Sequence, residues 1–343
     1  MERVLLTGAT GFIGSHVLRA FEGEGITTRC LLRKEADRGR LAAEPRQWCI
    51  GDIRDAGAVE AALDKCTAVV HCAALASDWG RRREFDEINI DGTLNILRGC
   101  ARKGVGHAII TGSISSYGEE HCGAAKNESW PYNPRYPYLL DRLLPSGMNH
   151  YRCSKAEATR RATVFAERNG IDLTVIEPVW VYGPREFHTG FYTYVKAVRD
   201  GASFMPGTRR NLFHVICATD LARAYVAALR KRPPGVERII VGNARPEPMN
   251  RIFSLFCREA ELKPPRLLPK WVIYPAGMLA EVWATLRGQT RAPLLTRSRV
   301  NMFYDTIAYS VDKAREVLGF EAEIDLEMGI KRTVEWYRRN AFL

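Results

Sequence analysis

The sequence lacks the features that mark membrane-spanning, secreted and metal-binding proteins. Residues 271–286 are largely apolar, but 16 residues are too few to cross a bilayer, and Pro275 and Glu281 interrupt them. The first predicted strand begins at residue 3, which leaves no room for a secretory leader, so we expect a cytoplasmic protein. None of the nine cysteines belongs to a Cys-x-x-Cys pair, which favours buried, reduced thiols. No His, Cys and Asp residues have metal-ligand spacing, so we predict no metal.

The charge and composition fit an ordinary globular protein. The formal net charge is +11, but the basic residues form short groups such as 81–83, without an aromatic-interleaved stripe, so we predict no nucleic-acid partner. With 343 residues, 46% of them hydrophobic, the chain is long enough for a nucleotide-binding domain and a smaller appended lobe. We interpret residues 271–286 as a helix packed within that lobe, with a peripheral membrane contact as the alternative.

A glycine-rich turn near the N-terminus is the clearest motif. Residues 4–6 are an apolar run typical of a buried strand, and Gly8, Gly11 and Gly14 follow where that strand turns into a helix. Glycines at this spacing allow a tight turn and the close approach of a pyrophosphate, which the helix N-terminus attracts. The motif predicts dinucleotide binding.

Strands and helices then alternate, which predicts an α/β fold. Crossover helices between apolar strands indicate a Rossmann-type, doubly wound parallel sheet. We predict a dinucleotide-binding domain in residues 1–178 and a C-terminal substrate-binding lobe in 179–343, with some segments returning to the core. The predicted strands are 4–6, 26–32, 48–50, 68–72, 108–111 and 173–176, and the predicted helices are 16–22, 56–63, 87–102, 151–169, 220–230 and 328–339.

Tyr151 and Lys155 lie four residues apart on one predicted helix, so their side chains share a face. A phenol is a poor base at neutral pH, but a neighbouring ammonium lowers its pKa. Tyr151 is therefore a candidate proton donor or acceptor for a carbonyl/alcohol pair.

Together these motifs resemble those of the extended short-chain dehydrogenases/reductases, with matches spread from residue 4 to residue 336. The matching motifs are the glycine loop in residues 7–14, Gly-Asp-Ile in 51–53, Val-His-Cys-Ala-Ala in 70–74, Asn-Ile-Asp-Gly-Thr in 89–93, Thr-Gly-Ser in 111–113, and the pair Tyr151 and Lys155.

The resemblance implies that Ser113 binds the substrate oxygen, Tyr151 transfers the proton, and Lys155 lowers the tyrosine pKa and holds the nicotinamide ribose. Ser113 is preferred to Ser115 and Ser116 because the aromatic-glycine pair of the family follows it by four residues. The cofactor-binding residues that the resemblance implies are Gly8, Thr10, Gly11, Phe12, Ile13, Gly14, Arg33, Lys34, Asp52, Ile53, Cys72, Ala73, Ala74, Tyr151, Lys155 and Pro178.

The end of the second predicted strand bears on which cofactor is used. An acidic residue there would accept a hydrogen bond from the adenosine 2′-hydroxyl and repel a 2′-phosphate, but the position is Leu32. Arg33 and Lys34 follow, and Arg can grip a phosphate with two hydrogen bonds. We therefore predict that NADPH is preferred over NADH, although two solvated basic residues would look the same.

The resemblance is nearest to the 3β-hydroxysteroid dehydrogenase, sterol-4-carboxylate dehydrogenase and dihydroflavonol reductase branch. It predicts an NADP(H)-dependent oxidoreductase for a secondary alcohol and ketone on a largely apolar substrate: 3β-hydroxysteroid-like, β-keto acid or flavanonol-like. A nucleotide-sugar epimerase/reductase is the first alternative, and a catalytically silent cofactor-binding regulatory protein the second. Common behaviour in the family predicts a homodimer formed through the helix of Tyr151 and residues 88–101.

Two features depart from the family. An insertion in residues 119–150, rich in aromatics and proline over 130–145, separates Ser113 from Tyr151, and we expect a lid, an oligomer contact or a surface insertion. Glu177 stands before Pro178, where the family often has arginine, which puts substrate contacts from that strand in doubt. His188 and His214 are candidates for substrate contact, although a lone histidine is more often structural.

Overall fold

The computed structural model describes residues 3–43, 47–77, 79–118, 122–144, 146–186, 190–208 and 210–343. At its centre lies one seven-stranded sheet in which every neighbouring pair is parallel. The strands, in their order across the sheet, are β11 (Val236–Val241), β6 (Asp172–Pro178), β5 (His107–Thr111), β4 (Ala68–His71), β1 (Arg3–Thr7), β2 (Thr27–Leu32) and β3 (Gln47–Ile50).

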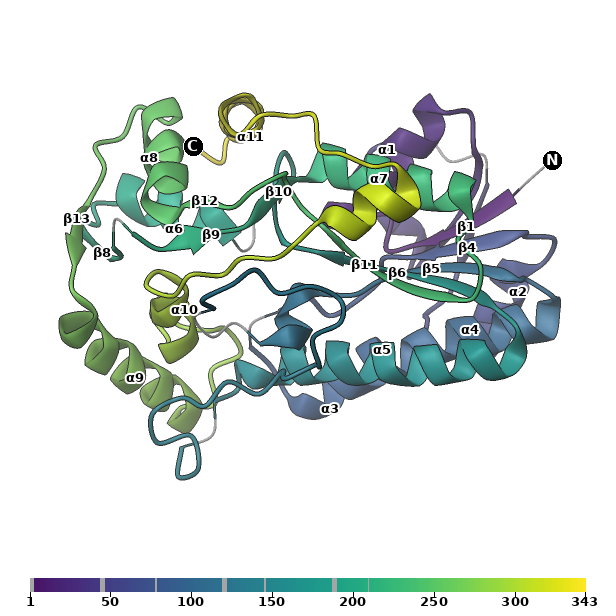
Figure 1. The fold of residues 1–343 in the computed structure, drawn as a ribbon, viewed down its shortest axis with the longest axis horizontal. Coiled ribbons are helices and arrows are strands. Elements are labelled where there is room, and N and C mark those ends of the chain that lie inside the picture. The colour runs from purple at the N-terminus through teal and green to yellow at the C-terminus, as the bar shows by residue number, and fades with distance from the viewer. Residues whose placement is uncertain are drawn as a thin grey trace.

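Helices cover both faces of this sheet, as Figure 1 shows. This arrangement explains why the central strands are apolar on both sides, with residues such as Leu5 and Leu6 fully buried. One face carries α1 (Phe12–Gly23) and α7 (Ala218–Lys231), and the other carries α2 (Ala56–Leu63), α3 (Arg82–Phe85), the π-helix η2 (Asp86–Asp91), α4 (Gly92–Lys103) and α5 (Asn149–Asn169).

The predicted parallel sheet is confirmed. All six strands predicted from apolar runs are present, with ends that differ by no more than a residue or two from the prediction. The seventh strand, β11, was not predicted; it brings the chain from the C-terminal half back to the sheet and pairs with β6. The predicted helix 87–102 is longer, because α3, η2 and α4 follow one another without a break.

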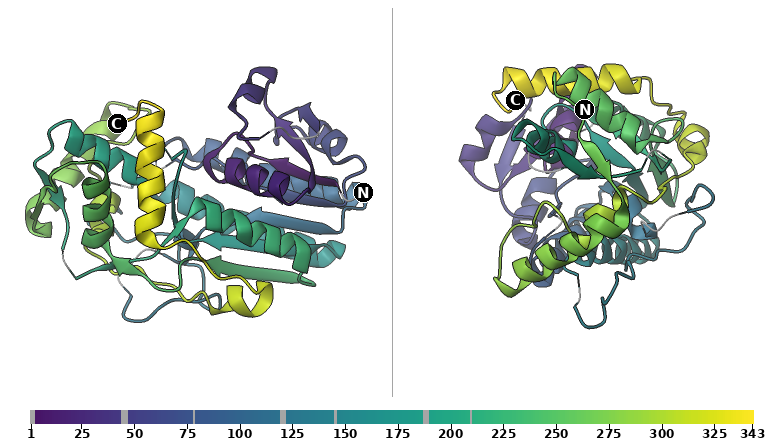
Figure 2. Two further views of the ribbon diagram at one scale, coloured as in Figure 1. Left: turned by 90° about the horizontal axis from the view of Figure 1, so that it is seen from above. Right: turned by 90° about the vertical axis from the view of Figure 1, so that its left-hand side faces the viewer.

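The smaller lobe lies at the carboxyl ends of the strands (Figures 1 and 2), where ligands bind in open α/β sheets. Three two-stranded pairings hold it together: β10 with β7, β12 with β9, and β13 with β8. Its elements are β7 (Trp180–Tyr182), α6 (Gly190–Arg199), β8 (Phe204–Pro206), β9 (Leu212–Phe213), β10 (Val215–Cys217), β12 (Glu247–Pro248), α8 (Met249–Glu259), β13 (Arg266–Leu268), α9 (Lys270–Leu286), α10 (Arg297–Met302) and α11 (Leu326–Arg339).

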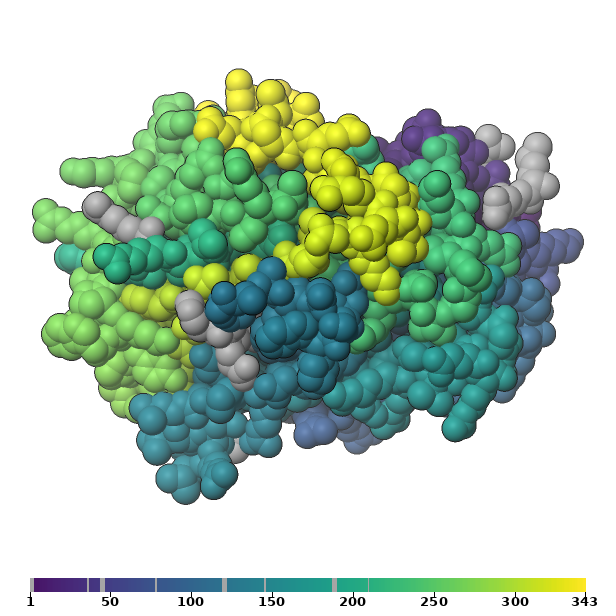
Figure 3. Space-filling model, viewed as in Figure 1, coloured from purple at the N-terminus to yellow at the C-terminus, as the bar shows by residue number. Residues whose placement is uncertain are grey.

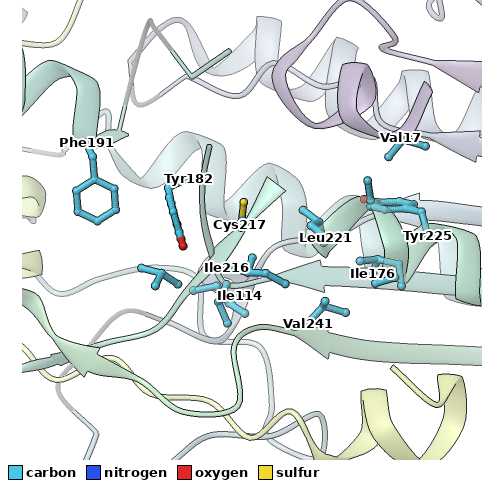
Figure 4. Packing of buried hydrophobic residues seen from close by; sticks show 14 of the residues in the cluster. Val17, Ile114, Ile176, Tyr182, Phe191, Ile216, Cys217, Leu221, Tyr225 and Val241 are labelled. Carbon is cyan, nitrogen blue, oxygen red and sulfur yellow. The ribbon is translucent and has the colours of Figure 1, made fainter. Parts of the chain in front are cut away.

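The lobe and the sheet share one hydrophobic core. The C-terminal residues, yellow in Figure 3, run over both parts on that face. Beneath them, Ile176 and Val241 from the sheet belong to the same buried cluster as Tyr182, Phe191 and Ile216 from the lobe (Figure 4). This continuous burial fixes the lobe against the sheet.

The predicted state of the cysteines is confirmed, since all nine are free and buried or half-buried. Within the described ranges, no helix is long and apolar enough to cross a membrane. No three His, Cys, Asp or Glu side chains of the described residues are grouped so that they could hold a metal ion.

Candidate active site

The glycine turn between β1 and α1 has room for no side chain at two of its positions. Gly8 has a φ of +75°, and a Cβ there would lie 2.6 Å from the backbone nitrogen of Ala73. A Cβ on Gly14 would lie 2.1 Å from the carbonyl oxygen of Gly8. No side chain caps α1 at Gly11, and no acidic residue occupies its first turn, which begins at Phe12. The exposed turn and the positive end of the helix dipole therefore suit a pyrophosphate.

The other residues predicted to bind the cofactor border this turn. Thr10, Cys72 and Ala74 are half-buried, the last two directly after β4, which pairs with β1. Ile13 and Pro178 both line a cavity at the carboxyl ends of β1 and β6. The structure thus brings together the predicted pyrophosphate and nicotinamide sides of the site.

Beyond the end of β2 lies the predicted adenosine side. Leu32 is buried, and no carboxylate of the described residues lies within ion-pair distance of the exposed Arg33 and Lys34. Asp52 accepts hydrogen bonds from Arg54, at 2.8 Å in the closest, and this contact lowers the pKa of the Asp52 carboxyl, with a smaller contribution from the charge of Arg33. The Asp52 carboxylate is therefore already paired with Arg54, with the charge of Arg33 nearby.

Lys155 is buried next to the end of β5. Its ammonium donates a hydrogen bond to the carbonyl oxygen of Thr111, which ties α5 to the strand that ends before Ser113. Burial lowers the pKa of Lys155 to about 8. Tyr151, one turn earlier on α5, is half-buried and lines the cavity. The structure therefore places Tyr151 at the cavity wall and Lys155, one turn further along α5, in the protein interior.

Two serines, not one, face this cavity. Ser113 and Ser115 both line it, and their hydroxyl oxygens are 2.8 Å apart. Ser113 also accepts a hydrogen bond from the backbone nitrogen of Ser115, at the start of the short 3-10 helix η3 (Ile114–Tyr117). Ser116 is fully buried and is not among the lining residues. Ser113 stays the predicted substrate ligand, and Ser115 holds its hydroxyl in place.

A chain of buried hydrogen bonds positions α5 relative to the glycine turn. The imidazole of His71 bonds Thr7 at 2.7 Å and Thr93 at 3.2 Å, and burial lowers the pKa of His71 to about 3, so it is neutral. The side-chain amide of Asn89 accepts from Leu75 at 2.7 Å and donates to Ser154 on α5 at 2.9 Å. The π-helix η2 carries Asn89 into this position.

The cavity itself has a volume of about 220 Å³ and a mixed wall. Its lining residues include the hydroxyl residues Ser113, Ser115 and Tyr151 and two arginines, Arg152 and Arg299. None of its described lining residues is a carboxylate. Sequence reasoning missed both arginines, because only the folded chain brings α10 to the start of α5. The apolar lining residues are Ile13, Ala76, Ile114, Met148, Pro178, Val179, Trp180, Val181 and Met302.

The residue before Pro178 faces away from this cavity. Glu177 is fully buried and accepts hydrogen bonds from Tyr117, at 2.5 Å, and from Tyr132. Burial raises the pKa of Glu177 to about 7. Glu177 therefore anchors the insertion through Tyr132 and is not among the lining residues.

The rest of the insertion is fastened to α9 and α10. Arg297 and Glu281 form a buried ion pair at 3.0 Å, with side chains that are 1% and 2% exposed. Arg297 also donates to the carbonyl oxygens of Leu139 and Leu144, at 2.8 and 2.9 Å. None of the described residues 130–144 lines the cavity, so a lid role stays a prediction.

Of the two candidate histidines, His214 lies among the described residues, and it takes no part in the described site. His214 is buried, bonds the carbonyl oxygen of Asn243 at 2.7 Å, and is not among the lining residues of the cavity. His188 lies outside the described residues.

Known proteins share this architecture. Residues 4–242 match the NAD dependent epimerase/dehydratase family. Sterol demethylase protein B of Methylococcus capsulatus is 28% identical over 69% of this chain and 69% of its own length. The 2-alkyl-3-oxoalkanoate reductase of Shewanella oneidensis is 24% identical over 97% of this chain and 85% of its own. MoeE5 in complex with UDP-glucose and NAD has the same fold, with a TM-score of 0.76 at 22% identity, over 99% of both chains. The chain therefore belongs to the NAD dependent epimerase/dehydratase family, the extended short-chain dehydrogenases/reductases.

Proposed function

We propose that the protein is an NADP(H)-dependent oxidoreductase that interconverts a secondary alcohol and a ketone on a largely apolar substrate. The observation that carries this proposal is one cavity lined by both Ser113 and Tyr151, with Lys155 buried one turn further along the helix of Tyr151. The apolar remainder of the wall supports a substrate of the same character.

In the direction of reduction, the Ser113 hydroxyl donates a hydrogen bond to the ketone oxygen and Tyr151 gives that oxygen its phenolic proton. The positive charge of Lys155 stabilises the phenolate that remains. A nicotinamide cofactor held at the glycine turn of Gly8, Gly11 and Gly14 would supply the hydride to the carbonyl carbon, which together with the proton from Tyr151 would give the alcohol. With a pKa of about 8, Lys155 is mostly cationic at pH 7.

The preference for NADPH is supported by the residues after β2. Arg33 and Lys34 are both exposed, and the nearby Asp52 carboxylate is already paired with Arg54. Replacing Arg33 by alanine should lower kcat/KM for NADPH by about 10- to 100-fold, as expected for the loss of a charged hydrogen bond, and should leave NADH use unchanged. The values of kcat/KM for NADPH and for NADH measured with Arg38→Ala are the control. A preference of the unmodified protein for NADH would contradict the proposal.

Among apolar substrates, we favour one that carries a carboxylate, as a β-keto acid does. The guanidinium side chains of Arg152 and Arg299 both belong to residues that line the cavity, and their positive charge would attract such a group. The name of one relative, the 2-alkyl-3-oxoalkanoate reductase of Shewanella oneidensis, supports the same class. Replacing Arg299 by glutamine should therefore lower kcat/KM about tenfold or more for a β-keto acid but not for its methyl ester. Equal losses for acid and ester would contradict the carboxylate assignment.

The experiment that tests the proposed reaction is a screen of NADPH oxidation against 3-ketosteroids, β-keto acids, flavanonols and nucleotide sugars. We expect turnover of at least one apolar ketone, and its loss in Tyr151→Phe. Turnover of nucleotide sugars alone would favour the epimerase alternative. Cofactor binding without turnover of any substrate would favour the silent regulatory protein.

A further inference from the structure

Helix α9 presents its apolar residues to solvent and its one acidic residue to the interior. Trp271, Leu279, Trp283 and Leu286 are 79%, 66%, 55% and 79% exposed. These four recur at spacings of eight, four and three, which places them on one side of the helix. Glu281 is buried in its ion pair on the opposite side. An ordinary surface helix buries its apolar side and exposes its polar side. The outer side of α9 instead exposes apolar side chains to water, which is unfavourable.

The insertion extends this apolar surface. Leu139 and Leu143 are 58% and 78% exposed. Leu140, 46% exposed, has a φ of +61°, a strained conformation for a residue with a side chain. The backbone nitrogen of Leu139 lies 3.4 Å from the hydroxyl of Tyr274 on α9, so loop and helix form one surface. Figure 3 shows this part of the insertion projecting from the lower edge of the molecule, beside the green residues of α9.

Every exposed charge on this surface is positive. The exposed charged residues are Arg142 on the loop and Arg287 and Arg291 near the end of α9, whereas Lys270 is half-buried and pairs with Asp305 at 3.5 Å. Arg287 stacks on Trp283, 4.1 Å from its ring centroid. The two acidic residues of these segments, Asp141 and Glu281, are buried.

We propose that α9 and residues 139–144 form a docking surface for an anionic lipid bilayer. Trp and Leu side chains enter the boundary between headgroups and acyl chains, while the arginines at the rim meet the lipid phosphates. A two-fold contact with a second copy would instead bring the three exposed cations of each copy together, and the projecting loop would need a matching hollow.

This surface lies next to the candidate active site. Arg297, which binds Glu281 of α9, is followed by Ser298 and Arg299 in the cavity wall. Docking would hold the cavity close to the bilayer, which dissolves apolar molecules. The inference rests on exposure and charge alone and does not depend on the proposed reaction.

Sedimentation with vesicles tests the inference. Vesicles of phosphatidylcholine with phosphatidylglycerol should carry the protein down, vesicles of phosphatidylcholine alone much less, and high salt should weaken binding. Leu279→Glu should lower the partition coefficient about tenfold or more, since it places a charge in the interface. Leu143→Glu on the loop should have a similar effect. Met328→Glu, a 43% exposed methionine on α11, is the matched control and should bind like the unmodified protein.

Three outcomes would overturn the proposal. The first is no binding to anionic vesicles. The second is unchanged binding by both glutamate variants when their melting temperatures are also unchanged. The third is a dimer in lipid-free solution that both substitutions convert to a monomer. Because both leucines are exposed, the variants should melt as the unmodified protein does.

Discussion

The buried ion pair between Arg297 and Glu281 makes a strong prediction about stability. In Arg297→Met, the partners that the Glu281 carboxylate keeps among the described residues are the hydroxyl of Ser146 and the backbone nitrogen of residue 297. The carbonyl oxygens of Leu139 and Leu144 also lose their donors. Removing one member of a buried pair costs about 3–5 kcal/mol, because the other charge stays buried without compensation. We therefore expect the free energy of unfolding to fall by at least about 3 kcal/mol.

Urea unfolding followed by tryptophan fluorescence measures this loss. Glu281→Gln combined with Arg297→Met should recover part of the stability, because no buried charge is left unpaired. Arg287→Met, an exposed arginine at the end of the same helix, should change the free energy of unfolding by less than about 0.5 kcal/mol. A loss below about 1 kcal/mol in Arg297→Met, or a double variant less stable than the single one, would refute the reasoning.

Two further predictions concern pH. Burial holds the pKa of Lys155 at about 8, below its ordinary 10.5, so the unfolded chain binds the extra proton between these values. The unmodified protein should therefore gain about 3 kcal/mol of stability relative to Lys155→Met as the pH rises from 8 to 10.5, measured by urea unfolding at each pH. Burial raises the pKa of Glu177 from 4.5 to about 7, so here the folded protein holds the extra proton. The free energy of unfolding of the unmodified protein should therefore fall by about 3 kcal/mol relative to that of Glu177→Gln as the pH rises from 4.5 to 7. In either experiment, a stability difference between protein and variant that does not change with pH would contradict the pKa assignment.

The sequence predicts those parts of the site that depend on short stretches of chain. The glycine turn, the apolar strands and the Tyr151–Lys155 spacing each lie within one element or one connection, so periodicity and residue type suffice. The structure adds what depends on contacts between distant segments. Arg299 reaches the cavity only because α10 packs near α5, and nothing around residue 299 in the sequence signals this position.

The apolar segment 271–286 shows the same limit more sharply. Its composition fits either a helix packed in the lobe or a surface helix, and only the fold decides which side is covered. In the structure Glu281 faces inward because Arg297 meets it there, and the tryptophans are left outside. Glu177 is a second case, since only the fold shows that Tyr117 and Tyr132 bind it, away from the cavity.

The transfer of deuterium tests the central claim most directly. NADPH labelled with deuterium at the transferable C4 position is incubated with the protein and an apolar ketone, preferably a β-keto acid, and the product is analysed by mass spectrometry. The account predicts one deuterium on the new carbinol carbon, with stoichiometric oxidation of NADPH, and no labelled product from Tyr151→Phe. Conversion of a nucleotide sugar without net oxidation of NADPH, together with unlabelled ketones, would contradict it.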